Sequence, residues 1–243
     1  MPSQKAVLAI SVILLQVLDI AIIVMVGVWM GHYRGGFAWD GTFKEFNYHP
    51  VCMIVSMIFL NSEAMIVFRV FSEWNRFKLK LLHMSIQVIA FAFGTVGLKA
   101  VFDFHNFMGF TNMYSLHSWT GLLCFILFSC QLACGFFGFL YPVFPDGLRM
   151  VYLKVHKYFG ASIFFLAVGT SLTGIMQKIR FALKTDYESL PPEAVFVNIL
   201  ALGVVIHAGL VYFIVSNEDF KQTVAPEEQQ RLMDISGEQD END

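Results

Sequence analysis

The sequence predicts an all-α integral membrane protein with six transmembrane helices and a central four-helix bundle. The first observation is composition, because 56% of the 243 residues are hydrophobic and 14% are charged, against about 25% charged in a typical soluble domain. The second is six apolar stretches of about the 20 residues that a helix needs to cross a bilayer. Lipid offers no partner to unpaired backbone groups, which favours helices. The net charge of -3 indicates no nucleic-acid partner.

The first two helices are expected at residues 6–30 and 49–71. The first follows Lys5 and is longer than a signal-peptide core, and no small-residue cleavage site follows it. Asp19 lies within it, where a carboxylate is costly, so it is either functional or turned inward and hydrogen-bonded. Pro50 lies in the first turn of the second helix and fits there because that position needs no amide donor.

The third and fourth helices are expected at 81–101 and 116–140. A loop with three basic residues precedes the third, and a polar loop at 103–115 separates it from the fourth. The fifth and sixth are expected at 155–176 and 194–215, with two consecutive prolines just before the sixth.

This pattern divides the chain into a six-helix domain, residues 1–216, and an acidic tail, residues 217–243, that is expected to be disordered. An even number of spans puts both termini on one side of the membrane. Ten of the 16 Lys and Arg residues fall on that side. The positive-inside rule therefore places both termini in the cytoplasm.

Four histidines organise the middle of the chain: His49, His83, His117 and His156. The intervals between them are 34, 34 and 39 residues, and each begins an apolar stretch. Because successive helices reverse direction, alternate histidines reach the same depth. The spacing predicts two pairs, His49 with His117 and His83 with His156, and hence two metal centres stacked across the bilayer. The other three histidines have no partner at a matching depth.

Haem is the metal group that this pattern favours. Two opposed imidazoles suit a haem iron that transfers electrons, and a porphyrin needs room between helices. Gly121 and Gly160 each lie four residues after a predicted ligand, on the same helix face. Such glycines also serve ordinary helix packing in membranes. Together with the matched histidine depths, they predict two haem b groups whose irons lie on the order of 20 Å apart across a hydrocarbon layer of about 30 Å.

Each predicted centre has its own polar surroundings. On the cytoplasmic side, Arg76, Lys80 and Arg149 precede the ligands and would attract a small anionic reductant, although positive-inside contact with membrane lipid is an equal alternative. On the other side, His105, Asn106 and Tyr114 precede His117 and can bind an electron acceptor or simply order the loop. His105 is the first choice, because a histidine can bond an anion or a metal ion.

Four segments resemble the animal branch of the cytochrome b561 family: RGGFAWDG at 34–41, FNYHPVCM at 46–53, AMIVFRVF at 64–71 and NMYSLHSWTG at 112–121. The resemblance covers residues 33–213 and includes all four histidines. It implies a homodimer of six-helix chains in which the central four helices hold two b-type haems. It also implies that cytoplasmic ascorbate donates an electron that reaches monodehydroascorbate or a ferric chelate on the other side.

The resemblance also implies roles for single residues. Arg76, Lys80 and Arg149 match the ascorbate site, although the family often has lysine where Arg76 stands, which changes the hydrogen-bond geometry. His105 matches a non-cytoplasmic substrate histidine, and Tyr114 lies in the matching loop motif. The resemblance thus implies that the chain is a transmembrane ascorbate-dependent oxidoreductase.

Two other functions compete with electron transfer. The four histidines can instead line a path for protons or metal ions in a transporter without redox activity, or the protein can be a membrane scaffold. The compartment is suggested only by residues 228–233, which resemble an acidic dileucine sorting signal. This favours an endosome, a lysosome or a secretory vesicle over the plasma membrane.

Overall fold

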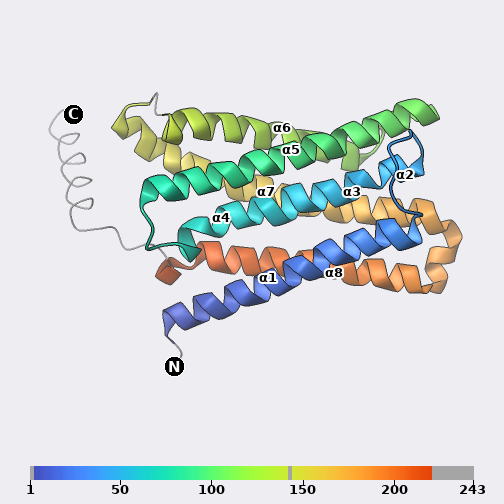
Figure 1. Ribbon diagram of the computed structural model, residues 1–243, viewed down its shortest axis with the longest axis horizontal. Coiled ribbons are helices and arrows are strands. Elements are labelled where there is room, and N and C mark those ends of the chain that lie inside the picture. The colour runs from blue at the N-terminus through green and yellow to red at the C-terminus, as the bar shows by residue number, and fades with distance from the viewer. Residues whose placement is uncertain (1–2, 142–143, 221–243) are drawn as a thin grey trace.

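The computed structural model describes residues 3–141 and 144–220, and every regular element in those ranges is a helix. Figure 1 shows the long helices running side by side. The elements are α1 (Gln4–Val28) and the π-helix Trp29–Tyr33, α2 (Phe43–Phe46), α3 (Tyr48–Met53), the π-helix Ile54–Leu60, α4 (Asn61–Val70), α5 (Arg76–Met108), α6 (Leu116–Gly135) and the π-helix Phe136–Leu140, α7 (Asp146–Leu183) and the 3-10 helix Lys184–Ser189, α8 (Pro192–Ser216) and the 3-10 helix Glu218–Phe220.

Within residues 3–141 and 144–220, six continuous helical segments are long and apolar enough to cross a membrane, by length and composition. This confirms the predicted class of an all-α, multi-pass membrane protein. The six spans are Gln4–Tyr33, Phe43–Val70, Arg76–Met108, Leu116–Leu140, Asp146–Ser189 and Pro192–Ser216.

The spans are longer than the apolar stretches that predicted them. α5 exceeds the expected 81–101 at both ends, and α7 exceeds 155–176. As a result His105, expected in a loop, lies on α5, which ends at Gly109 in the left-handed conformation with φ 70°. The physical reason is that apolar side chains mark only the part of a helix in hydrocarbon, whereas polar turns continue the helix into the interface.

The helices divide into an inner group and an outer pair. α3 packs on α5, α6 packs on α7, and α1 packs on α8 beside them (Figure 1). The described chain begins and ends at the same end of the bundle, where the Gln4 amide donates a hydrogen bond of 2.9 Å to Asp219. The Arg69 guanidinium, near the end of α4, also donates to the carbonyl of Val215 at the end of α8. The first bond joins the two ends of the outer pair, and the second fastens α8 to the inner group.

The outer surface of the bundle is apolar, as contact with lipid requires. On α1 alone, seven large aliphatic side chains are exposed: Ile10, Ile13, Leu14, Val17, Ile20, Val24 and Val28. The opposite stripe of the same helix, including Leu15, Ile22 and Val26, is buried against the bundle. A soluble monomer rarely exposes an apolar patch of this extent.

The predicted tail lies mostly beyond the described residues. Asn217 ends α8 and residues 218–220 form the short helix that follows it. The expected disorder of the rest of the tail, and the dileucine-like segment at 228–233, fall outside the part of the chain that the structure describes.

Candidate functional site

The structure brings the four histidines together in the two predicted pairs. His49 on α3 and His117 on α6 have ring centres 6.1 Å apart. His83 on α5 and His156 on α7 have ring centres 6.3 Å apart. The four residues therefore come from four different helices of the inner group, and each pair joins two of them.

Hydrogen bonds fix which ring nitrogen is free in three of the histidines. The Nδ1 atoms lie 3.0 Å from the Gly97 carbonyl for His49, 2.7 Å from Ala64 for His83 and 2.9 Å from Thr170 for His117. A carbonyl oxygen only accepts, so each Nδ1 must carry the hydrogen.

The consequence is a lone pair on Nε2 of each of these rings, which is the state in which a neutral imidazole ligates a metal. His156 is the exception, because its buried Nδ1 has no hydrogen-bond partner. Its backbone carbonyl is held by the Gln131 amide at 2.6 Å.

The spacing within each pair suits one metal atom between two imidazoles. A metal–imidazole bond of about 2 Å on each side, with roughly 1 Å from each nitrogen to its ring centre, puts the ring centres about 6 Å apart. A bare ion would need further ligands. Among the described residues, however, no group of three or more His, Cys, Asp or Glu is arranged to hold a metal ion.

A cavity of about 770 Å³ surrounds the His49–His117 pair. Its wall is mostly aromatic and aliphatic, with contributions from α3, α5, α6 and α7. Gly121 and His105 also line it. A large flat apolar group with a metal at its centre fits such a space better than a hydrated ion does.

Glycines on the neighbouring helix stand against two of the rings. A Cβ added to Gly174 on α7 would lie 2.5 Å from Cε1 of His117, and one added to Gly135 on α6 would lie 3.0 Å from Cε1 of His156. The first distance is shorter than real Cβ contacts, and the second is tight enough that the ring would have to shift by a few tenths of an ångström. Glycine is therefore required at position 174 for the His117 ring to keep its place, and at position 135 it gives the His156 ring room.

Of these two glycines, the sequence indicated Gly135 as a further position of close helix approach, but it did not indicate Gly174. Gly121 and Gly160 were expected to clear space beside the ligands on the same helix. A Cβ at Gly121 would meet Thr170 at 3.3 Å, and one at Gly160 would meet Gln131 at 3.5 Å. Helix periodicity relates residues within one helix, whereas the tight approaches here are between helices.

Basic residues gather near the His83–His156 pair through helix periodicity. Lys80 and Arg76 precede His83 on α5 by three and seven residues, so all three share one face. Arg149 precedes His156 on α7 by seven residues, or two turns. Its guanidinium is in close contact with the carboxylate of Asp146. These residues lie at the end of the bundle where the described chain begins and ends (Figure 1).

The opposite end of the bundle holds the predicted acceptor residues. His105 lines the cavity of the His49–His117 pair, and so does Tyr114, whose hydroxyl accepts a hydrogen bond of 2.7 Å from Gln177. Asn106 is on the surface and accepts a hydrogen bond from Asn112 at 2.8 Å. The structure therefore puts His105 and Tyr114 at the cavity and uses Asn106 to order the adjoining turn.

Lys178 is a cavity residue that the sequence did not single out. Its ammonium nitrogen lies 4.0 Å from the centre of the Phe46 ring and 5.6 Å from that of Phe43. The sequence placed it in a loop after the fifth apolar stretch. Because α7 continues two turns further, it instead faces the same space as His105.

A family model described as eukaryotic cytochrome b561 matches residues 48–182, more than half of the chain. The matched segment contains both histidine pairs. The chain belongs to the cytochrome b561 family. This confirms the resemblance noted in its sequence motifs.

Curated relatives extend the similarity to nearly the whole chain. The "Transmembrane ascorbate-dependent reductase CYB561" of Mus musculus is 40% identical over 233 residues, covering 96% of this chain and 93% of the relative. The "Plasma membrane ascorbate-dependent reductase CYBRD1" of Xenopus tropicalis is 43% identical over 206 residues, covering 84% and 72%. Cytochromes b561 are electron-transfer proteins, and the transporter alternative gains no support.

The family implies haem b, and the residues of this chain fit it. His49, His83, His117 and His156 would hold the haem iron through neutral imidazoles, and bound haem would supply one-electron redox chemistry. The level of each pair can be read along α7, which carries His156 and also Thr170, whose carbonyl accepts the hydrogen bond from His117. Thr170 lies fourteen residues after His156. At 1.5 Å per residue the two pairs are about 21 Å apart along the helix, in line with the separation expected from the histidine spacing.

Proposed function

We propose that this cytochrome b561 carries electrons from ascorbate across a membrane through two haem b groups. The observation that carries the proposal is the pairing of four histidines at two levels, three of them with Nε2 freed by a backbone hydrogen bond at Nδ1. Bound haem supplies one-electron reduction and oxidation of its iron. The names of the relatives support ascorbate as the donor.

His83 and His156 would hold the haem that receives the electron. Arg76, Lys80 and Arg149 would bind the ascorbate anion beside it, since guanidinium and ammonium groups hold anions by charge-assisted hydrogen bonds. The charge distribution supports a cytoplasmic location for this end, because ten of the 16 basic residues fall on the side of the termini.

His49 and His117 would hold the haem that delivers the electron. The acceptor would bind near His105 and Tyr114, with Asn106 ordering the surface beside them. A cavity reaching from the histidine pair to His105 supports this assignment. Monodehydroascorbate and a ferric chelate are both anionic, and Lys178 on the same cavity would attract either.

The remaining expectations concern the assembly and its membrane. We infer that residues 1–216 form one domain, that two chains form a homodimer, and that lipid covers the apolar outer surface. Curated relatives are named for the plasma membrane in one case and simply as transmembrane in another. A secretory vesicle, endosome or lysosome remains our proposal for this chain.

The decisive experiment uses purified protein in sealed vesicles. Ascorbate added on the side of the termini should give a b-type absorbance spectrum with about two haems per chain. Vesicles loaded with monodehydroascorbate or with ferric citrate should then reoxidise the haem, and the faster acceptor identifies the substrate. A folded, colourless protein from haem-replete cells would exclude the proposal, and proton or metal flux without absorbance change would support the transporter instead.

A further inference from the structure

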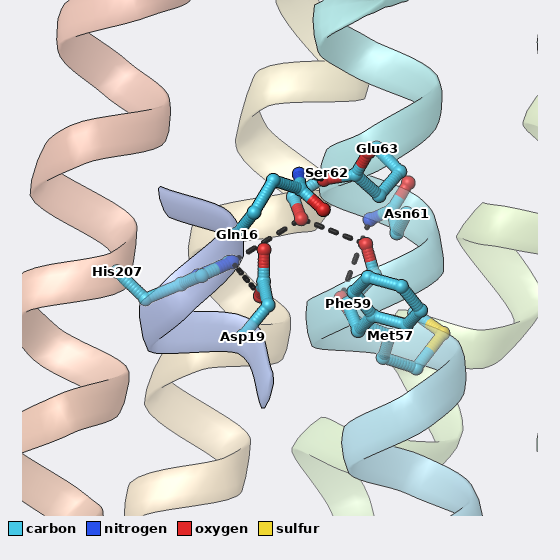
Figure 2. Close-up of polar contacts among 8 residues, drawn as sticks. All are labelled: Gln16, Asp19, Met57, Phe59, Asn61, Ser62, Glu63 and His207. Carbon is cyan, nitrogen blue, oxygen red and sulfur yellow. Dashed lines mark hydrogen bonds and ion pairs between the residues drawn. The ribbon is translucent and has the colours of Figure 1, made fainter. Parts of the chain in front are cut away.

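Three ionisable side chains meet inside the bundle away from the histidine pairs (Figure 2). Asp19 comes from the middle of α1, Glu63 from α4 and His207 from α8. Asp19 is 2% exposed and His207 is fully buried. Ionisable groups are costly in a membrane interior and usually have a function there, yet electron transfer between the haems uses none of these three.

The hydrogen bonds define where one proton sits. His207 Nε2 lies 2.9 Å from Asp19 Oδ1 and 3.2 Å from the Ser62 hydroxyl oxygen. Ser62 donates its only hydrogen to the Phe59 carbonyl at 2.7 Å, so it must accept from His207. Nε2 therefore carries a hydrogen that Ser62 and Asp19 share.

Two atoms of the same pair lack any partner. Nδ1 of His207 and Oδ2 of Asp19 are both buried and make no hydrogen bond. A buried polar atom without a partner costs about 1–3 kcal/mol. Each is also a position where a proton can bind, because Nδ1 holds a lone pair when Nε2 carries the hydrogen. The Asp19–His207 pair therefore has vacant proton positions enclosed by protein.

The charge of the cluster favours the binding of protons at these vacant positions. The Gln16 amide donates a hydrogen bond of 2.6 Å to Glu63, and the ionisable groups that face Glu63 are Asp19 and His207. The other helices packed here present an amide, Gln87 on α5, and an aromatic ring, Phe164 on α7. With both carboxylates ionised and the imidazole neutral, two negative charges would be buried. Each proton that binds removes one of them.

Glu63 connects the enclosed pair to the surface. It is half-buried and, with Gln16, lines a pocket of about 330 Å³ between α1, α4 and α5. The pocket continues along α4 to Val70 and Phe71, at the end of the bundle where the described chain begins and ends. Protons can therefore reach Glu63 from the side on which we place ascorbate.

The cluster is also adjacent to Ala64, the residue whose carbonyl holds the proposed haem ligand His83 in place. Glu63 precedes Ala64, whose carbonyl accepts the hydrogen bond from His83 Nδ1. A second hydrogen bond joins α4 and α5, because the Gln87 amide donates to the Asn61 side-chain oxygen at 3.0 Å. Added negative charge at the His83–His156 pair would therefore be felt by the carboxylates of the cluster.

We propose that Asp19, Glu63 and His207 form an intramembrane proton-binding site that takes up a proton when the His83–His156 centre is reduced. This rests on the proposed function. One electron enters from ascorbate and one proton enters from the aqueous phase on the same side. When the electron moves on, the proton returns, so that no proton crosses the membrane and the charge stays balanced at each step.

Infrared difference spectroscopy of the full-length holoprotein tests the proposal. Electrochemical reduction in water should give a signal in the protonated-carboxyl C=O region that shifts to lower frequency in heavy water. Glu63→Gln or Asp19→Asn should remove or reduce it. Asp103→Asn should leave it unchanged, because that carboxylate pairs with Lys99 on the surface of α5. If Asp19→Asn fails to fold, the wild-type and Glu63→Gln spectra decide.

A second readout is the reduction potential of the haem nearer the termini. One proton bound per electron lowers it by about 59 mV for each tenfold fall in proton concentration, and His207→Gln should flatten that dependence. A reducible protein with both haems but no carboxyl signal, or with the same signal in Glu63→Gln and Asp19→Asn, overturns the proton site and leaves electron transfer intact. Loss of the haem spectrum in wild type would instead overturn the proposed function.

Discussion

At the scale of single residues, the Nδ1 atom separates histidines of different purpose. In His49, His83 and His117 it donates to a backbone carbonyl, which leaves a free lone pair on Nε2. In His207 the arrangement is reversed, since Nε2 carries the hydrogen and Nδ1 is empty. The same kind of side chain is therefore suited to bind a metal in one place and a proton in another.

Removing single ligands should separate the two haems by side. His83→Ala or His156→Ala should lose about one haem per chain and slow reduction by ascorbate on the side of the termini. His49→Ala or His117→Ala should also lose about one haem, yet keep that first reduction and block transfer across. Stopped-flow absorbance of each variant in sealed vesicles measures both steps. The reverse pattern would mean that our orientation is wrong.

Removing basic residues should weaken ascorbate use without loss of haem. A hydrogen bond to a charged group is worth about 1.5–3 kcal/mol, so Lys80→Ala should raise the KM for ascorbate roughly tenfold or more. Arg149→Ala should also raise this KM, although the contact with Asp146 offsets part of the charge of its guanidinium.

The control for these variants is Lys154→Ala. Lys154 is exposed on α7 and lies two residues from His156, on a different helix face. Steady-state kinetics with a haem-to-protein ratio for each variant separates binding from folding. If all three variants kept the KM of the wild-type protein for ascorbate, these basic residues would serve only lipid contact and topology.

At the scale of elements, α6 and α7 are fitted to each other by glycines. Gly174 of α7 faces His117, and Gly135 at the end of α6 faces His156. Each of these two helices thus contributes a histidine to one pair and a glycine that contacts a histidine of the other pair. The spacing of the histidines along the sequence does not indicate this reciprocal arrangement.

Gly174→Ala should displace the His117 ring, since the new Cβ would lie 2.5 Å from Cε1. We expect loss of up to one haem per chain, measured by absorbance after extraction of the haem. Gly169→Ala on the same helix is the matched control, because nothing lies within 4 Å of its added Cβ. Full haem content in both variants would show that the ring can move aside at no cost.

The helix boundaries show where prediction from sequence stops. α6 and its π-helical end, 116–140, match the predicted range because Ser115 is a clear N-cap and the whole segment is apolar. α5 and α7 were underestimated because their outer turns carry charged residues. The same error put His105 and Lys178 in loops, although both lie on helices beside the cavity.

At the scale of the whole molecule, the order of the spans and the pairing of the histidines could be predicted, because both follow from regular reversal of the chain. Contacts between helices distant in sequence could not. Asp19 on α1 and His207 on α8 are 188 residues apart, and nothing in either apolar stretch indicates that they meet. Gly174 and Lys178 escaped notice for the same reason.

A chain that ends at Phe220 should retain both haems. All four histidines and their carbonyl partners lie on α3 to α7 or the π-helix between them, so residues 221–243 are not needed to build the centres. Haem content and ascorbate reduction of the shortened protein should equal those of the full chain. A shortened protein that folds without haem would refute the division into a domain at 1–216 and a separate tail.

The reciprocal fit of α6 and α7 has a consequence for biosynthesis. A sliding movement between α6 and α7 that disturbed one proposed haem site would disturb the other as well, because each of these two helices contributes to both sites. The first haem to be inserted would therefore align α6 and α7 for the second. In a cell short of haem, newly made chains should divide into fully loaded and empty molecules, with few that hold a single haem.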